Sequence, residues 1–223
     1  KMPLQNMSFE QLVNMLIVPA LLATLKMLVW AMVLSVFFGL CIGLVLALTR
    51  KGGLCENFVI YRTFDIFVSV VRSFPFIILM ISIIPLTKLI MGTSIGWQAA
   101  IVPLTFACSP FMGRIIQNAL QEVNPALIEV AQSFGASKFQ IVMRVMVVEA
   151  IPAIVSGVVL AIINLLGATA MAGVIGGGGL GATAMIYGYQ NFNDKVMYSI
   201  CVVLVILVLL IQYIGDFVYN KLK

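Results

Sequence analysis

Long apolar runs alternate with short polar stretches along this chain, and five of the runs are long enough to cross a membrane. A membrane-spanning helix needs ~20 predominantly apolar residues. Because lipid offers no hydrogen-bond partner to an open backbone, each run that crosses it is expected to be helical. The five runs cover about Leu28–Leu48, Val68–Ile84, Ile95–Ile115, Ile151–Ala172 and Met197–Phe217. The pattern therefore predicts an all-α polytopic membrane protein with five transmembrane helices.

Two segments beside these runs are expected to lie along a membrane surface. The stretch SFEQLVNMLIVP, residues 8–19, has a capping box of Ser8 and Gln11 and one apolar face, and Pro19 is expected to end it. It indicates an amphipathic surface helix within an N-terminal segment of residues 1–25. The stretch Leu54–Ile84 is too long for one upright span, so its first part, which includes Asp65, is expected to run along the inner surface.

Composition supports a single membrane domain over residues 1–223. The chain is 62% hydrophobic and 9% charged, with a mean hydropathy of +1.15, whereas roughly a quarter of the residues in soluble domains are charged. Five spans and their short connections leave no room for a separate soluble catalytic domain. Any energy source for work by this protein must therefore lie on another chain.

The residue types also exclude several kinds of chemistry. The chain has no histidine, the usual metal ligand and neutral-pH acid or base, and no two carboxylates lie close together in sequence. We therefore expect no catalytic residues and no metal site. The four cysteines are scattered and are expected to pack as small hydrophobic residues. The net charge of +5 is spread over several loops, which argues against nucleic-acid binding.

The distribution of lysine and arginine predicts the orientation. Arg72 lies near a span, and four basic residues fall on one side: Lys1, Lys26, Lys88 and Lys195. Eight fall on the other side: Arg50, Lys51, Arg62, Arg114, Lys138, Arg144, Lys221 and Lys223. By the positive-inside rule the side with eight faces the cytoplasm. The amino terminus is then outside, and the carboxyl terminus and residues 124–148 are inside.

Polar and small residues in the spans mark a candidate translocation path. Pro103 and Pro110 predict a kinked third span that faces a cavity. Asn164 indicates that the fourth span also faces a cavity, because an amide in hydrocarbon needs a hydrogen-bond partner. Arg72, beside a bend expected at Pro75, fits either interfacial anchoring or substrate contact. The candidate path and gate residues are Arg72, Pro75, Asn164, Thr169, Met171, Gly176 and Gly178.

Glycines in the first span and after the fourth span have different interpretations. Gly39 and Gly43 form a GxxxG pattern that predicts close helix packing. The stretch GVIGGGGLGA contains a formal GxGxxG, but no strand precedes it, and no GxxxxGK[ST] occurs anywhere, so we expect no nucleotide site on this chain. The stretch instead predicts a flexible loop at the outer mouth, which is either a gate or a simple connection.

The residues 124–148 predict a cytoplasmic helical hairpin. Asn124 is a suitable N-cap, Pro125 a suitable first residue, and Gly135 is placed to end the first helix. Ser137 and Gln140 form a capping box for a second helix that continues toward Pro152. Its apolar face fits either the inner leaflet or a groove on a partner protein.

Here the chain resembles a known family. Glu129, Val130, Ala131 and Gly135 resemble the "EAA...G" motif of the permease subunits of bacterial ABC importers, with Val130 in place of alanine and Val147-Val148 where the family often has Leu-Pro. The stretches RSFPFIIL, IPLTKLIMGTSIGWQAAIVPLT, GVIGGGGLG and LVLLIQYIGD are similar to the methionine-uptake members of the type I importers.

The resemblance implies a permease subunit that is not itself an enzyme. It implies a homodimer in the bacterial inner membrane that carries D- or L-methionine or a related amino acid. Its partners would be two ATP-binding cassette subunits, which bind ATP and Mg, and a lipid-anchored binding protein outside, while membrane lipid surrounds the spans. The residues implied to dock the ATPase are Glu129, Ala131, Phe134, Gly135, Ala136 and Ser137.

Other classes of membrane protein fit the residues less well. A secondary transporter or channel normally needs ionisable or selective polar groups within the membrane, and apart from Arg72 the spans offer none. A membrane enzyme would need a nucleophile and a base. A structural subunit without a path remains an alternative, which the kinked third span and the polar fourth span argue against.

Overall fold

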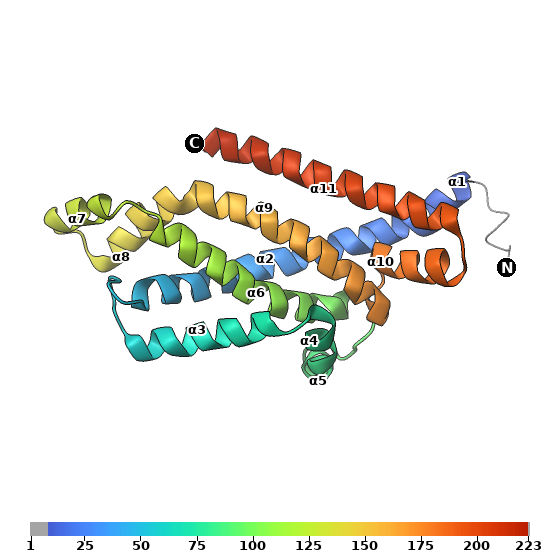
Figure 1. Ribbon diagram of the computed structural model, residues 1–223, viewed down its shortest axis with the longest axis horizontal. Helices are drawn as coiled ribbons and strands as arrows, with labels where there is room; N and C mark the ends of the chain where they lie inside the picture. Colours follow the sequence, from blue (N-terminus) through green and yellow to red (C-terminus); the bar gives the residue numbers. More distant parts are fainter. Residues whose placement is uncertain (1–8, 223) are drawn as a thin grey trace.

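The computed structural model describes residues 9–222, and within this range the chain forms helices and no strands. Four long helices lie along the long axis of an elongated bundle (Figure 1): α2 (Val18–Thr49), α6 (Trp97–Gln121), α9 (Val147–Ala172) and α11 (Asp194–Leu222). The shorter helices are α1 (Phe9–Leu12), α3 (Phe58–Ser73), α4 (Phe76–Ser82), α5 (Ile84–Met91), α7 (Pro125–Ser133), α8 (Lys138–Gln140) and α10 (Gly179–Thr183). The predicted all-α membrane fold is confirmed, with four spans, or five when the bent pair α3 and α4 is counted.

The first helix is much longer than its apolar run suggested. It continues from α1 through a π-helical turn at Val13–Ile17 into α2, so the expected helix end at Pro19 is wrong. Proline normally disrupts a helix because it lacks an N–H and its ring clashes with the carbonyl four residues back. In the π-helical turn the Val18 N–H bonds the Val13 carbonyl, five residues back. This wider turn accommodates the proline without ending the helix.

The start of this helix also packs against protein. Leu12 and Ile17 are buried with Leu180 of α10 and with Val196 and Ile200 of α11. The predicted apolar face therefore exists, but it contacts two other helices of the chain. Ser8, the first residue of the predicted capping box, lies outside the described residues.

Small residues let α2 and α6 approach closely. A side-chain carbon built on Gly43 would lie 2.7 Å from the Cβ of Ile116, and one built on Gly113 would lie 2.6 Å from the Cγ2 of Ile42. A carbon built on Gly39 would overlap Met112. The GxxxG pattern was predicted to serve helix packing, and this prediction is confirmed.

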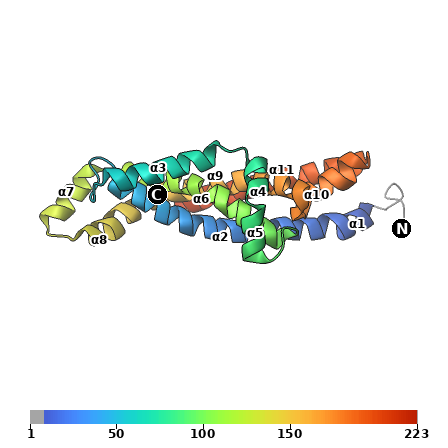
Figure 2. The ribbon, with the colours of Figure 1, turned by 90° about the horizontal axis from the view of Figure 1, so that it is seen from below.

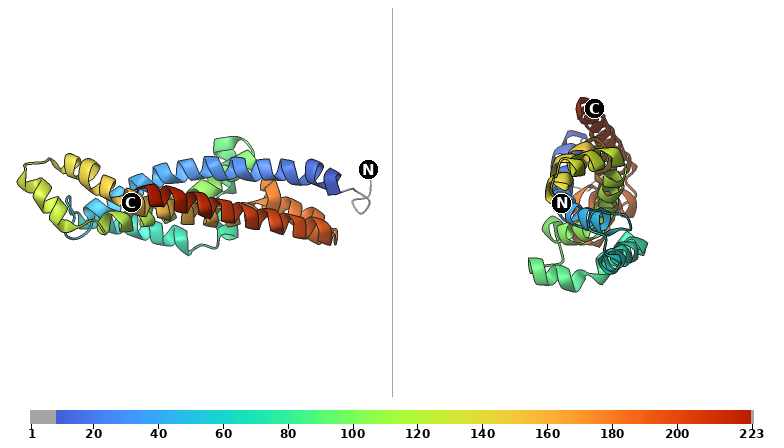
Figure 3. Two further views of the ribbon diagram at one scale, coloured as in Figure 1. Left: turned by 90° about the horizontal axis from the view of Figure 1, so that it is seen from above. Right: turned by 90° about the vertical axis from the view of Figure 1, so that its left-hand side faces the viewer.

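Helix α3 lies lengthwise beside α2 and α6 (Figure 1), so the expected surface course of this segment is wrong. The Arg114 guanidinium of α6 donates to the Asp65 carboxylate of α3 at 2.7 Å, and a second Arg114 nitrogen donates to Gln117 at 2.9 Å. This ion pair holds the charged positions of α3 against α6. At Ser73 the chain turns, and α4 is inclined by 107° to α3. Figure 3 shows α5 projecting sideways from the bundle.

The two ends of the bundle carry different structures. Helices α7 and α8 extend beyond one end, the amino-terminal helix reaches the other, and α11 runs back toward the α7 end (Figure 2). From Lys138 the chain is helical through a π-helical turn at Ile141–Met146 and through α9, which contains Pro152, up to a kink at Ile175 and Gly176, where the backbone is not helical. Val147 and Val148, the departure from the family motif, lie inside this helix.

The glycine-rich stretch was predicted to be a flexible loop, but it forms a compact junction. The Gly96 N–H before α6 bonds the Gly176 carbonyl at 2.9 Å, and the Leu180 N–H bonds the Thr24 hydroxyl of α2 at 2.9 Å. Side-chain carbons built on Gly173 and Gly181 would collide with backbone atoms across the turn. Glycine is required here because α9, α10 and the adjoining backbone pack in direct contact.

Candidate functional site

The hairpin at the end of the bundle has the local structure that its residues predict. The Asn124 side chain accepts a hydrogen bond from the Ala126 N–H at 3.0 Å and caps α7. Gly135 turns the chain with a φ of +76°, a region that glycine adopts without strain. The Ser137 hydroxyl accepts from the Gln140 N–H, and the Gln140 side chain accepts from the Ser137 N–H. The predicted caps and the predicted turn are confirmed.

The two sides of this hairpin differ in exposure. Ala131 and Ala136 are half-buried and pack against the core, which seats the hairpin on the bundle. Outward, Leu127, Val130 and Phe134 form an apolar stripe at helical spacing, with Phe134 87% exposed at the tip. Phe139 of α8 adds a second exposed ring, 73% exposed. The hairpin thus presents an apolar surface that its own bundle does not cover.

The remaining hairpin candidates lie beside this stripe. Glu129 is exposed and lines a cavity of about 380 Å³ together with Arg50 and Lys138. The Ser137 hydroxyl serves as the helix cap. Within the predicted docking set, Phe134 is therefore the exposed apolar side chain. Ala131 and Ala136 pack the hairpin against the bundle, and Ser137 caps its second helix.

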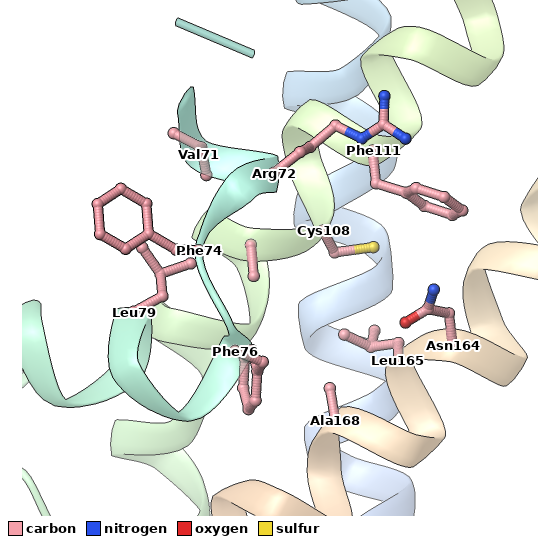
Figure 4. Close-up of a pocket in the computed structure, with 11 residues that line it drawn as sticks. Val71, Arg72, Phe74, Phe76, Leu79, Cys108, Phe111, Asn164, Leu165 and Ala168 are labelled. Atoms are coloured by element: carbon pink, nitrogen blue, oxygen red, sulfur yellow. The ribbon is translucent and has the colours of Figure 1, made fainter. Parts of the chain in front are cut away.

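A second site lies between the spans, where α3 ends beside α6 and α9. It is a cavity of about 290 Å³. Figure 4 shows Arg72 of α3 and Phe111 of α6 on one side and Asn164 of α9 across from them. The guanidinium carbon of Arg72 lies 5.8 Å from the centre of the Phe111 ring, which is within range of a cation–π contact. The other lining residues are Val71, Phe74, Phe76, Leu79, Ala107, Cys108, Leu165 and Ala168.

Only some of the predicted path residues meet at this cavity. Arg72 and Asn164 line it, and Pro75 lies between two residues that do. Thr169 is buried, and its hydroxyl donates to the Leu166 carbonyl at 2.6 Å. Met171 is 45% exposed and does not line the cavity. Gly176 and Gly178 belong to the glycine junction.

The cavity also includes residues that the sequence reasoning did not single out. Cys108 and Phe111 are three residues apart on α6, and Asn164 and Ala168 are four apart on α9. This spacing places each pair on one face of its helix. Spacing could have shown these faces, but it could not show that the two faces meet.

Comparison with known proteins places the chain in a family. A family model for the inner membrane component of binding-protein-dependent transport systems matches residues 39–223. The chain belongs to this family. It is therefore a permease subunit of an ABC importer and a multi-pass membrane protein, and the predicted resemblance is confirmed.

Individual relatives of this inner membrane component carry similar descriptions. The chain is 44% identical to the probable D-methionine transport system permease protein MetI of Vibrio cholerae, over 90% of this chain and 89% of that protein. It is 41% identical to the methionine import system permease protein MetP of Bacillus subtilis, over 78% of this chain and 79% of that protein. None of these relatives supports the secondary-transporter or channel alternative.

Solved structures show the same fold. A chain from an inward-facing conformation of the MetNI methionine ABC transporter superposes with a TM-score of 0.93 at 42% identity, over 97% of this inner membrane component and 100% of that chain. A chain from an amino acid ABC transporter crystallised with histidines superposes with a TM-score of 0.78 at 21% identity, which is a likeness of fold alone.

Proposed function

We propose that this permease subunit forms, as a homodimer in the bacterial inner membrane, the translocation path for D- and L-methionine. The substrate assignment is supported by the names of relatives that align with most of the chain. The homodimer is supported by the high structural similarity to a subunit of the MetNI transporter. A binding protein, anchored to lipid outside, would deliver the amino acid at the end of the bundle opposite the hairpin.

The observation that carries the mechanism is the free apolar stripe on the hairpin. A capped helix with Leu127, Val130 and Phe134 on its outer side has the form of a helix that lies in a groove of another protein. The occupant we propose is an ATPase subunit, one for each copy of the chain. ATP and Mg would bind there, and the movement of the docked helices would open and close the path.

Reconstitution tests this function directly. Vesicles that contain this chain, its ATPase and its binding protein should take up labelled D- and L-methionine only when ATP is supplied on the ATPase side. Vesicles that lack this chain provide the control. ATP-dependent entry of another amino acid without methionine would contradict the substrate and retain the mechanism. Methionine entry that is independent of the ATPase would contradict the mechanism.

A further inference from the structure

The cavity between α3, α6 and α9 lies about halfway along the spans. Cys108 and Phe111 are the twelfth and fifteenth of the 25 residues of α6, and they face the cavity. Arg72 is at the same level because its guanidinium lies against the Phe111 ring. A cation at mid-helix height is costly in a membrane and is normally paired with another group.

Arg72 is not paired in this way. Among residues 9–222, the ion pair that the structure shows is Arg114 with Asp65, on the part of α3 nearer the hairpin. The contact of the Arg72 guanidinium is the face of the Phe111 ring, which attracts a cation without neutralising it. No aspartate or glutamate lines the cavity. The lining therefore offers Arg72 no carboxylate, and apart from the partial negative charge at the carboxyl end of α3 its positive charge is left for an anion to neutralise.

The lining residues other than Arg72 suit the amino group and the side chain of an apolar amino acid. The Asn164 amide, across the cavity from Arg72 in Figure 4, offers both donors and an acceptor. Phe76, Leu165 and Ala168 supply an apolar wall, and aromatic rings make favourable contacts with a thioether sulfur. The volume of about 290 Å³ is just below the range of about 300–1,000 Å³ for ligand pockets, which suits a small amino acid.

We propose that this cavity is a transient binding site for the carboxylate of the transported amino acid, held by Arg72, with the side chain against the apolar wall that α4 and α9 form. The site rests on the proposed function of methionine import. Without an acidic partner for the ammonium group, binding is weak enough to permit release, as a transport path requires. A fatty acid from the bilayer offers the same carboxylate, so the test must separate the two sources.

The experiment uses the complete reconstituted complex and a methionine analogue that carries a photoreactive diazirine in its side chain. After illumination, peptide mass spectrometry locates the label. In the wild type we expect label on cavity residues of α6 or α9. Arg72→Gln should reduce this label about tenfold or more, the size expected for loss of a charge-assisted hydrogen bond. Arg72→Lys should retain part of it.

Arg62→Gln is the matched control, because Arg62 is an exposed arginine on the same helix that does not line the cavity. It should leave the label unchanged. Size-exclusion chromatography of each complex verifies that the variants assemble. Unlabelled methionine should compete for the site, whereas methioninol, which has a hydroxyl in place of the carboxylate, should not.

Three results would contradict the site. They are equal labelling of wild type and Arg72→Gln, competition by methioninol as strong as by methionine, and displacement of the label by palmitate with no displacement by methionine. Uptake into the same vesicles reports on the proposed function separately. If the wild type imports methionine but any of these three results is found, the site is wrong and the function stands. If it imports none, the function itself fails.

Discussion

Gly135 turns the chain at the tip of the hairpin, beside the exposed ring of Phe134 that follows α7. Its φ of +76° lies in the left-handed region, and a side-chain carbon built on it would meet nothing within 4 Å. A substitution there is therefore limited by backbone strain of about 1–2 kcal/mol and by what the new side chain does to a partner. These two effects can be separated experimentally.

We expect Gly135→Arg to leave the chain in the membrane and to abolish binding of the ATPase, because a long charged side chain would stand at the apolar docking surface. Gly135→Ala, which adds the strain alone, should retain the ATPase. Gly92 has a φ of +71° and equally open surroundings after α5, so Gly92→Arg is the matched control and should also retain it. The measurement is co-purification of the ATPase with each variant. Normal complex formation by Gly135→Arg would contradict the docking assignment.

Hydrogen bonds between residues close in sequence could be predicted from the sequence. Asn124, Ser137 and Gln140 make their capping bonds within three residues, so the pattern alone contains the geometry. That Arg72 and Asn164 line one cavity could not be predicted, because it depends on how two distant helices pack. The pairing of Asp65 with Arg114 was missed for the same reason, and with it the lengthwise course of α3.

Among the elements, the crossing of α2 and α6 is a close helix contact that has glycines on both helices. Without the hydrophobic effect to drive helices together inside lipid, their association depends on van der Waals packing of small residues. Gly43 and Gly113 lie on the facing sides of this crossing. Both helices would have to move apart to accept a side chain there.

We expect Gly43→Ala to lower the free energy of unfolding by about 1–3 kcal/mol, the usual cost of overpacking. Gly167→Ala is the control. It is also a helical glycine, but a carbon built on it meets nothing within 4 Å, so the better helix propensity of alanine should leave stability equal or raise it by up to about 1 kcal/mol. Reversible denaturation in detergent measures both. Equal effects of the two substitutions would show that the crossing tolerates wider spacing.

Element boundaries were the least predictable part of the fold. Pro19 was expected to end a helix, yet the chain continues through it because the π-helical turn before it changes the hydrogen bonding. Nothing in the sequence distinguishes a proline that ends a helix from one that a wider turn accommodates. The glycine-rich stretch was misjudged in a similar way, since its glycines permit tight contact and were interpreted as flexibility.

At the scale of the whole molecule, the hairpin and the glycine junction lie toward opposite ends of one elongated bundle (Figure 1). The charge count predicts that the hairpin end faces the cytoplasm. Cys55 is exposed in the connection between α2 and α3, and Phe192 is 90% exposed in the turn before α11 at the other end. These two positions provide a test of orientation.

We expect a membrane-impermeant maleimide to label Phe192→Cys in intact cells and Cys55 only after the membrane is permeabilised. The physical reason is that the reagent cannot cross lipid, so each thiol reports the side on which it lies. Peptide mass spectrometry assigns the label to each cysteine. Labelling of Cys55 in intact cells, with protection of Phe192→Cys, would mean that the chain is inserted in the opposite direction.

The helical stretch from Lys138 to the kink at Ile175 has a mechanical consequence. At 1.5 Å per residue it is a rod about 55 Å long, attached to the hairpin at one end and, through the kink and the hydrogen bond between Gly176 and Gly96, to the start of α6 at the other. A tilt of about 1° around one end of such a rod displaces the other end by about 1 Å. An angular change at the hairpin end would therefore reach the kink at Ile175 and Gly176, toward the other end of the bundle, as a linear displacement.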